Sequence, residues 1–330
     1  MRIFARADYQ FISRRRITYA ISAVLIVIGL AAIAFNTLRG SGWLNYGIDF
    51  TGGVLIQARF HQPTTVEQVR QALRTTSATE IARFRESSEF IIRTPAEETE
   101  ASETNAEAIT AALRTAFGEG AFEVVRTELV GPRVGTELER KAALAIGLSF
   151  LLTLIYLAFR FETRFGVAAI LATAHDILIT VGFLAAFRIE VGVATVASIL
   201  TVVGYSLNDT IVVFDRIREN LRKTRQAHGR EAEVVNRSIN ETLPRTILTS
   251  GTTLAVLIPL LFLGGAVLRD FALILTIGIV FGTYSSIFVA SPALLEIRRW
   301  SRRRRAEAVT VKAAVREPTR PMAKHGRTAA

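Results

Sequence analysis

Long apolar stretches, separated by charged connections, dominate the pattern of this chain. Six of them have the length and near-absence of charge of membrane spans, and they cover residues 17–35, 142–159, 165–187, 191–214, 246–265 and 271–295. A helix of about 20 apolar residues is long enough to cross the roughly 30 Å hydrocarbon core of a bilayer. The pattern therefore predicts an α-helical polytopic membrane protein with six transmembrane helices.

The segment 36–141, between the first two spans, has the pattern of a compact α+β domain. VLIQARF alternates as a strand does, and TVEQVRQALRT has apolar residues at helical spacing. The predicted elements, in order, are a strand at 54–60, a helix at 65–75, a hairpin formed by EIARFR and EFIIRT, a helix at 105–117 and a strand at 121–130. This β-α-β-β-α-β order is typical of the ferredoxin-like fold. The polar stretch 95–105 is predicted to be a loop.

The charge pattern predicts how the chain is oriented in the membrane. The formal net charge is +11, and the basic residues cluster at span ends and in the tail rather than on one soluble face, which argues against a nucleic-acid partner. Clusters precede the first span, fill the loop 215–245 and follow the last span, so both termini, 1–16 and 296–330, are expected in the cytoplasm. The domain 36–141 is then periplasmic. The basic tail 296–330 is expected to be disordered and attracted to anionic lipids.

The first span is expected to be a retained anchor rather than a cleaved signal peptide, because its apolar run exceeds the usual 7–15 residues or so. The chain contains no cysteine, so packing rather than disulfides must stabilise the exported part.

Three ionisable residues inside or beside the spans stand out: Asp176, Asp209 and Arg245. Each such group costs about 2.5–3.5 kcal/mol on insertion scales, so each needs a reason. Desolvation favours a neutral acid and a nearby cation favours a carboxylate, so a pairing of Asp209 with a moving Arg245 would suit a proton relay. Supporting polar residues at helical spacing are Asn208, Tyr205, Asp176 and Thr249. An interfacial Arg245, or a purely structural ion pair, remains the alternative.

The sequence gives less support to an enzymatic function than to a proton relay. Asp176 and Asp209 on neighbouring spans could form an aspartyl protease dyad, but Asp209 follows Ser-Leu-Asn rather than a glycine-bracketed loop. No phosphate-binding loop or zinc-protease motif occurs, and we expect no cofactor and no metal. The expected coupling ion is H⁺, although a lone carboxylate near hydroxyls could also accept Na⁺.

Five motifs, in order around the spans, resemble those of the SecF family of protein-export membrane proteins, within the RND superfamily. They are GIDFTGG at 47–53, VGPRVGTEL at 130–138, AHDILIT at 174–180, GYSLNDTIVVFDRIREN at 204–220 and ETLPRTILTSGTTL at 241–254. The resemblance covers roughly residues 9–300. One departure is Pro244, where the family more usually has a small polar residue; we expect it to be tolerated in the first turn of the fifth span.

The resemblance implies a non-enzymatic subunit that pairs with SecD in a pseudo-symmetric complex of the bacterial inner membrane. It implies work beside the SecYEG translocon, where the proton motive force helps to complete the export of preproteins driven by SecA. An aspartate in the fourth span and an arginine opening the fifth matter for proton flow in that family, and Asp209 and Arg245 occupy the matching positions. The alternatives are an RND-like exporter half and a passive translocon scaffold without proton coupling.

Overall fold

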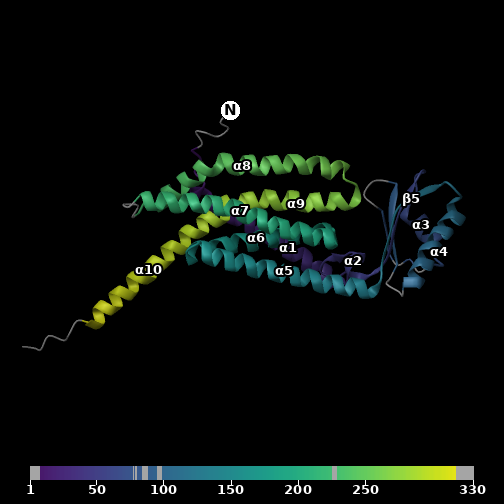
Figure 1. The fold of residues 1–330 in the computed structure, drawn as a ribbon, viewed down its shortest axis with the longest axis horizontal. Helices are drawn as coiled ribbons and strands as arrows, with labels where there is room; N and C mark the ends of the chain where they lie inside the picture. The colour runs from purple at the N-terminus through teal and green to yellow at the C-terminus, as the bar shows by residue number, and fades with distance from the viewer. Residues whose placement is uncertain are drawn as a thin grey trace, which may run out of the picture.

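Residues 8–76, 78, 80–83, 88–94, 99–224 and 229–316 are described by the computed structural model. A long helical bundle carries a small α+β domain at one end, and the last helix of the chain leaves the bundle at the opposite end (Figure 1). Among the described residues, six helices are long and apolar enough to cross a membrane. These spans are α1 (Arg15–Leu38), α5 (Pro132–Arg160), α6 (Thr163–Phe187), α7 (Val193–Lys223), α8 (Glu231–Leu263) and a last span that combines α9 (Gly265–Ser285), the π-helical turn η2 (Ser286–Ala290) and the first part of α10 (Ser291–Arg316), as far as Arg302. The chain is a multi-pass membrane protein.

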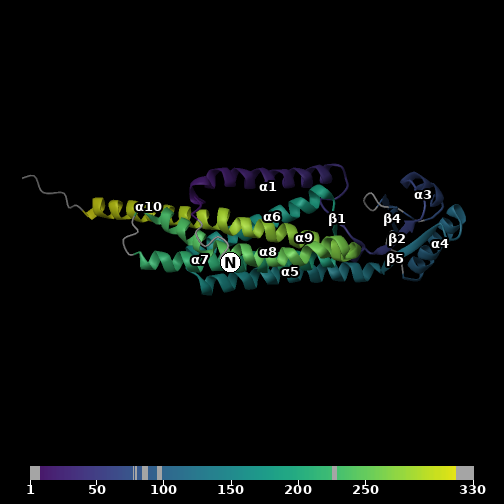
Figure 2. The same cartoon turned by 90° about the horizontal axis from the view of Figure 1, so that it is seen from above.

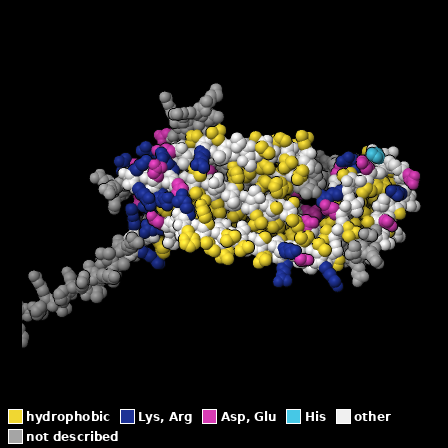
Figure 3. Space-filling model, viewed as in Figure 1, with side chains coloured by type: hydrophobic (Ala, Val, Ile, Leu, Met, Phe, Trp, Pro, Cys, Tyr) yellow, Lys and Arg dark blue, Asp and Glu magenta, His cyan; other side chains and the backbone are white. Residues whose placement is uncertain are grey.

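The bundle has a buried centre and two outer helices. Only 6% of the apolar window of α5 is buried, against 56% of that of α6, so α6 is central and α5 peripheral. Viewed from above, α1 and α5 lie on opposite flanks (Figure 2). The flank visible in Figure 3 is apolar or uncharged along the bundle, while Lys and Arg gather at the end away from the α+β domain. This end is called the arginine-rich end of the bundle below.

Two close glycine contacts bring pairs of helices unusually near each other. Gly29 of α1 and Gly182 of α6 meet backbone to backbone, because a Cβ built on Gly29 would lie 2.7 Å from the Gly182 Cα. Gly278 and Gly282 of α9 lie against Val202 and Ser206 of α7. The G-x-x-x-G pair in the last span therefore allows close helix contact, as such pairs do in membranes.

The connection between α7 and α8 differs from the predicted loop 215–245. α7 continues to Lys223 and α8 begins at Glu231, so most of that stretch is helix. Ion pairs one helical turn apart support these extensions: Arg216–Glu219, Lys223–Glu219 and Arg237–Glu241. The apolar face of the α8 extension, with Val235 and Ile239, is buried in the bundle rather than at the lipid surface. Pro244 consequently lies inside α8 and not in a first turn.

The tail prediction is wrong as far as Arg316, because α10 runs through it as a helix. Its many Ala, Arg, Glu and Lys residues are good helix formers and continue an existing helix, so no new nucleus is needed. The rest of the expected tail, 317–330, lies outside the described residues.

The α+β domain has the predicted ferredoxin-like topology. Its elements are β2 (Gly53–Phe60), α3 (Val66–Ala72), β3 (Glu80–Arg83), β4 (Glu89–Thr94), α4 (Thr99–Phe117) and β5 (Phe122–Val130). The sheet order is β3-β4-β2-β5 with antiparallel neighbours. Its core is a single apolar cluster that includes Phe90, Ile92, Ile109 and Leu113. The loop predicted at 95–105 is wrong from Thr99 onward, where α4 begins.

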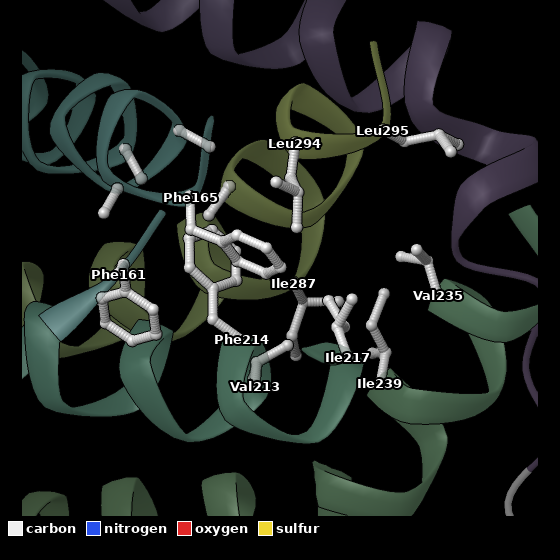
Figure 4. Packing of buried hydrophobic residues seen from close by; sticks show 14 of the residues in the cluster. Phe161, Phe165, Val213, Phe214, Ile217, Val235, Ile239, Ile287, Leu294 and Leu295 are labelled. Carbon is white, nitrogen blue, oxygen red and sulfur yellow. The ribbon is translucent and has the colours of Figure 1, made fainter. Parts of the chain in front are cut away.

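A second apolar core fills the arginine-rich end of the bundle (Figure 4). Phe214 of α7 meets Phe165 of α6 edge to face, with ring centroids 5.4 Å apart, and Leu294 and Leu295 of α10 are fully buried. This cluster joins α6, α7, α8 and the last span where they leave the apolar region.

The segment before α1 is held onto α8 by two buried asparagines. Asn236 and Asn240 each donate from Nδ2 to the Tyr9 carbonyl at 2.9 Å. In return, the Tyr9 amide donates to Asn240 Oδ1 at 2.9 Å and the Ile12 amide donates to Asn236 Oδ1 at 3.3 Å. The short 3₁₀ turn η1 (Ile12–Arg14) follows and leads into α1. These bonds fix the start of the first span against the fifth.

Candidate functional site

Asp209 lies inside the bundle on α7, with only 5% of its surface exposed. Thr246 of α8 donates from Oγ1 to Oδ1 at 2.6 Å, and Ser286 of η2 donates from Oγ to Oδ2 at 2.8 Å. Asp209 forms no ion pair with any cation among the described residues. The carboxylate is therefore buried with hydroxyl partners from two other helices.

Asp176 on α6 is a second buried carboxylate, 1% exposed. Ser206 and Ser285 donate to its Oδ2 at 2.5 and 2.7 Å, and its Oδ1 lies 2.9 Å from His175 Nδ1. The other ring nitrogen of His175 lies 2.9 Å from Ser22 Oγ on α1. This network links α1, α6, α7 and α9, and each carboxylate has its own set of hydroxyls. No hydrogen bond joins Asp176 to Asp209 in the described part of the chain, as a protease dyad would require.

The π-helical turn η2 brings the two carboxylates to one point of the last span. Ser285 ends α9 and binds Asp176, whereas Ser286 opens η2 and binds Asp209. Single π turns inside α-helices are frequently found at functional sites. Here neighbouring serines serve carboxylates on two different helices.

Arg245 lies elsewhere than the sequence suggests. Its side chain is exposed on α8, and it forms no ion pair with Asp209 among the described residues, so the expected direct pairing is absent from this conformation. Asn208 on α7 and Thr249 on α8 are also exposed. Tyr205 is half-buried, and its hydroxyl lies 3.3 Å from Thr253 Oγ1, which joins α7 to α8.

The exposed polar residues form two adjoining stripes on the surface of the spanning bundle. On α7 the stripe holds Thr201 and Asn208, and on α8 it holds Arg245, Thr249 and Thr252, with Tyr205 and Thr253 between them. Beside Asn208, a hollow of about 680 Å³ opens between α5 and α7, lined mainly by apolar side chains such as Leu148 and Leu152. Both features lie on the outer surface of the spanning helices.

Several residues around the carboxylates escaped the sequence analysis. Thr246, Ser286, Ser206 and Ser285 bond to them directly, and Ser22 bonds to His175 beside Asp176. Their only signal was a cluster of hydroxyls in otherwise apolar spans, such as T-Y-S-S at 283–286. Hydroxyls are common in membrane helices because they can bond to their own backbone, as Thr249 does with the Arg245 carbonyl.

A junction between the bundle and the α+β domain is built from the GIDFTGG stretch. Asp49 in α2 (Ile48–Thr51) accepts a hydrogen bond at 2.8 Å from the Val193 amide, the first of α7, where a negative charge suits the helix dipole. Glu190 in β6 (Glu190–Val191) pairs with Arg93 of β4, and β6 pairs in parallel with β1 (Asn45–Tyr46). Gly52, with φ of 70°, and Gly53, with φ of 116°, adopt backbone conformations that favour glycine as the chain enters β2.

Burial in this junction lowers the pKa of the Arg126 guanidinium from its ordinary value, and the carboxylates of Glu190, Asp49 and Asp270 act in the opposite direction. Among the described residues, no group of three or more His, Asp or Glu side chains is placed to hold a metal ion.

Comparison with known proteins finds one family over most of the chain. A family model described as protein export membrane protein SecD/SecF, C-terminal, matches residues 109–300, and one described as SecD/SecF GG motif matches residues 42–64. A protein translocase subunit SecF from Gemmatimonas aurantiaca is 46% identical over 310 residues, covering 92% of this chain and 91% of that protein. One from Escherichia coli O157:H7 is 39% identical over 297 residues, covering 88% of each.

Longer proteins contain a similar segment. A protein translocase subunit SecDF from Thermus thermophilus is 42% identical over 300 residues, which cover 88% of this chain but 38% of that protein. The crystal structure of SecDF, a translocon-associated membrane protein from Thermus, matches with a TM-score of 0.76 and 39% identity. A structure of SecDF in a super-membrane-facing form matches with a TM-score of 0.64 and 38% identity. This chain spans 40% of each of those two chains.

Proposed function

Because this chain belongs to the SecD/SecF family of protein-export membrane proteins, we propose that it is a non-catalytic translocase subunit that promotes protein export with energy from an ion gradient. The observation that carries the energetic part is Asp209, a carboxylate buried among hydroxyls inside the spanning bundle. Such groups are costly in membranes and mark ion pathways.

The hydroxyl partners of Asp209 suit both ionisation states. A serine or threonine O–H donates to a carboxylate, and the same oxygen accepts a hydrogen bond from a carboxylic acid. Thr246 and Ser286 can therefore stay in contact with Asp209 while a proton arrives or leaves. Proton binding would change the attraction between α7, α8 and the last span without exposing an unsatisfied group. The proposed coupling ion is H⁺, and Na⁺ is tested as an alternative below.

α7 connects this carboxylate to the α+β domain. The helix runs without interruption from Val193, whose amide is bound by Asp49, to beyond Asp209. The residues just before it form β6, which pairs with β1 and with Arg93 of the domain sheet. A shift of α7 that follows proton binding would therefore be passed to the domain through short polar contacts. The domain would in turn move against the emerging preprotein.

A second membrane subunit, SecD, is the proposed cover of the exposed polar stripes. An arginine facing lipid is costly, and Arg245 and Asn208 lie exposed on the spanning surface. In SecDF this segment makes up 40% of a longer chain, so further polypeptide is available there to cover the equivalent surface. Arg245 would then act across the subunit interface rather than as a direct partner of Asp209.

The proposed setting is the bacterial inner membrane, with both termini in the cytoplasm, the α+β domain in the periplasm and SecYEG as the neighbouring channel. The arginine-rich end opposite the domain supports this orientation, because positive charge concentrates on the cytoplasmic side. Preproteins delivered by SecA would be the chains on which the domain acts.

Export from inverted vesicles that carry SecYEG, SecA and SecD with this chain tests the coupling. A preprotein is stalled by removing ATP, and its completion is followed with and without an imposed proton gradient. A gradient of 100 mV supplies about 2.3 kcal/mol per charge, enough to shift a two-state equilibrium more than tenfold. We expect Asp209→Asn to abolish the effect of the gradient.

Asp215→Asn is the matched control, because Asp215 lies on the same helix but is half-buried and paired with Arg160 and Arg218. It should retain the response to the gradient. If Asp209→Asn retains it too, with the complex assembled, Asp209 is structural and the passive scaffold is the better function. A sodium gradient in place of the proton gradient identifies the ion.

Cysteine crosslinking tests the SecD interface separately. Because this chain contains no cysteine, an introduced one is its only reactive thiol. A single cysteine at Asn208 or Thr249 should crosslink to SecD, whereas one at Val27, exposed on α1, should not. Equal crosslinking at Val27, or none at the two stripe positions, would contradict this placement of the partner.

A further inference from the structure

A basic pocket lies at the arginine-rich end of the bundle, away from both buried carboxylates. It is a hollow of about 480 Å³ between the start of α6, the end of α7 and α10. Four arginines line it, together with Glu162, Thr163, Phe165 and Leu221; they are Arg164, Arg218, Arg222 and Arg298. Four guanidinium groups thus surround one hollow against a single lining carboxylate.

The positive charge of this pocket is only partly matched by the protein. Arg218 lies 3.3 Å from Asp215, and Arg298 lies 3.7 Å from Glu231, a distance too long for a good hydrogen bond. Arg164 and Arg222 make no ion pair with any described residue. The Nε of Arg298 is buried and has no hydrogen-bond acceptor among the described residues. An unsatisfied buried donor on a charged group costs free energy, which an anion in the pocket would offset.

The position of the pocket indicates where such an anion would come from. Phe165 and Leu221 contribute apolar surface beside the arginines, and Phe165 belongs to the apolar cluster of Figure 4, at the end of the spanning region. The first backbone amides of α6 also lie here, and their dipole favours a negative group. A ligand that combines an anionic phosphate with an adjoining apolar chain matches these walls. Basic pockets between membrane helices on the cytoplasmic side commonly bind anionic lipid headgroups.

We propose that the pocket formed by Arg164, Arg218, Arg222 and Arg298 binds the phosphodiester headgroup of an anionic phospholipid. The guanidinium groups hold the phosphate oxygens, since their planar forks match that geometry. Glu162 remains as an acceptor for a headgroup hydroxyl, as in phosphatidylglycerol. The lipid joins the ends of α6, α7 and the last span. This site is independent of Asp209 and of ion coupling.

Binding of dimyristoyl phosphatidylglycerol to the full-length chain in nonionic detergent tests the proposal, with bound lipid counted by native mass spectrometry. Each basic residue near an anionic lipid contributes about fivefold to binding, so Arg164→Gln with Arg222→Gln should weaken it about 30-fold. The control removes the same charge from two exposed arginines outside the pocket, Arg14→Gln with Arg299→Gln, and should bind within about twofold of wild type because the charges are screened. Arg222→Gln alone, at an exposed position, should lose about fivefold and guards against a folding defect.

Two further measurements distinguish an anionic lipid from a neutral lipid and from a soluble phosphate ester. Phosphatidylcholine of the same chain length should bind far more weakly, and free glycerol 3-phosphate should not compete at equal concentration. Equal loss in the pocket variant and the control would show general surface attraction and overturn the proposal. Full competition by glycerol 3-phosphate would show a site for a soluble phosphate and overturn the lipid assignment.

Discussion

Removing the Asn240 side chain should release the segment before α1 from α8. Asn240→Ala deletes two hydrogen bonds to the Tyr9 backbone, one donated by Asn240 Nδ2 and one accepted by its Oδ1. At about 1 kcal/mol net for each bond, docking of the segment loses about 2 kcal/mol. The undocked fraction should therefore rise about 30-fold.

Hydrogen exchange with mass spectrometry on a peptide covering residues 9–14 measures that fraction. The Ile12 amide donates to Asn236, so its exchange reports undocking directly. Asn220→Ala is the matched control. The side chain of Asn220, on α7, donates from Nδ2 to Ser238 and Glu241 of α8 and does not touch the N-terminal segment. It should leave the peptide 9–14 unchanged.

The double variant Asn236→Ala with Asn240→Ala should be non-additive, because both side chains donate to the same Tyr9 carbonyl. Exchange in Asn240→Ala that stays within about twofold of wild type would refute the assignment of about 1 kcal/mol to each bond. An equal rise in Asn220→Ala would show that α8 as a whole, and not the bonds made by Asn236 and Asn240, controls the segment.

Three further predictions concern packing and the domain junction. Gly182→Leu should lower the free energy of unfolding by about 1–3 kcal/mol, measured by thermal unfolding, because a Cβ at this position would lie 2.8 Å from the Gly29 Cα. Gly251→Leu should be nearly neutral, because a Cβ there would have nothing within 4 Å. Phe214→Ala should cost about 3–5 kcal/mol in denaturant unfolding and Phe214→Leu much less, because the ring is fully buried; equal losses would exclude a cavity effect. Glu190→Gln should raise hydrogen exchange in β4 about fivefold, because it removes the partly buried ion pair with Arg93. Glu67→Gln, which removes an exposed ion pair, should leave exchange in β4 unchanged. No change in either variant would show that the Glu190–Arg93 pair does not hold the domain against the bundle.

The sequence predicted the spans well because bilayer thickness imposes one length on every apolar run. It also predicted the ferredoxin-like domain, since strand alternation and helical spacing differ clearly, and its family resemblance is confirmed by the matches over residues 109–300 and 42–64. Helix ends outside the apolar region were missed. There α7 and α8 are stabilised by ion pairs, and Asn236 and Asn240 bond α8 to the segment before α1; neither kind of contact follows an apolar period.

The surroundings of Asp209 were less accessible to sequence reasoning. Thr246 and Thr249 are both threonines on α8, yet only Thr246 reaches the carboxylate, while Thr249 faces outward and bonds to its own helix. Arg245 precedes Thr246 in the chain and lies exposed, because consecutive helical residues point about 100° apart. Which side of each helix faces the bundle depends on packing against other helices, and residue spacing alone does not specify it.

The π-helical turn at Ser286–Ala290 makes chain length critical at this one point of the last span. Losing a residue there would restore ordinary α-helical bonding and remove the π turn that presents Ser285 and Ser286 to different carboxylates, whereas gaining one would rotate everything that follows by about 100°. In the longer chain, Leu294 and Leu295 would swing away from the apolar core that they now share with residues of α6 and α7. Substitutions within this turn leave the turn and the register of the span in place, whereas an insertion or deletion changes one or the other. Homologous chains should therefore vary in residue type here while keeping the same number of residues between the carboxylate-binding serines and the end of the span.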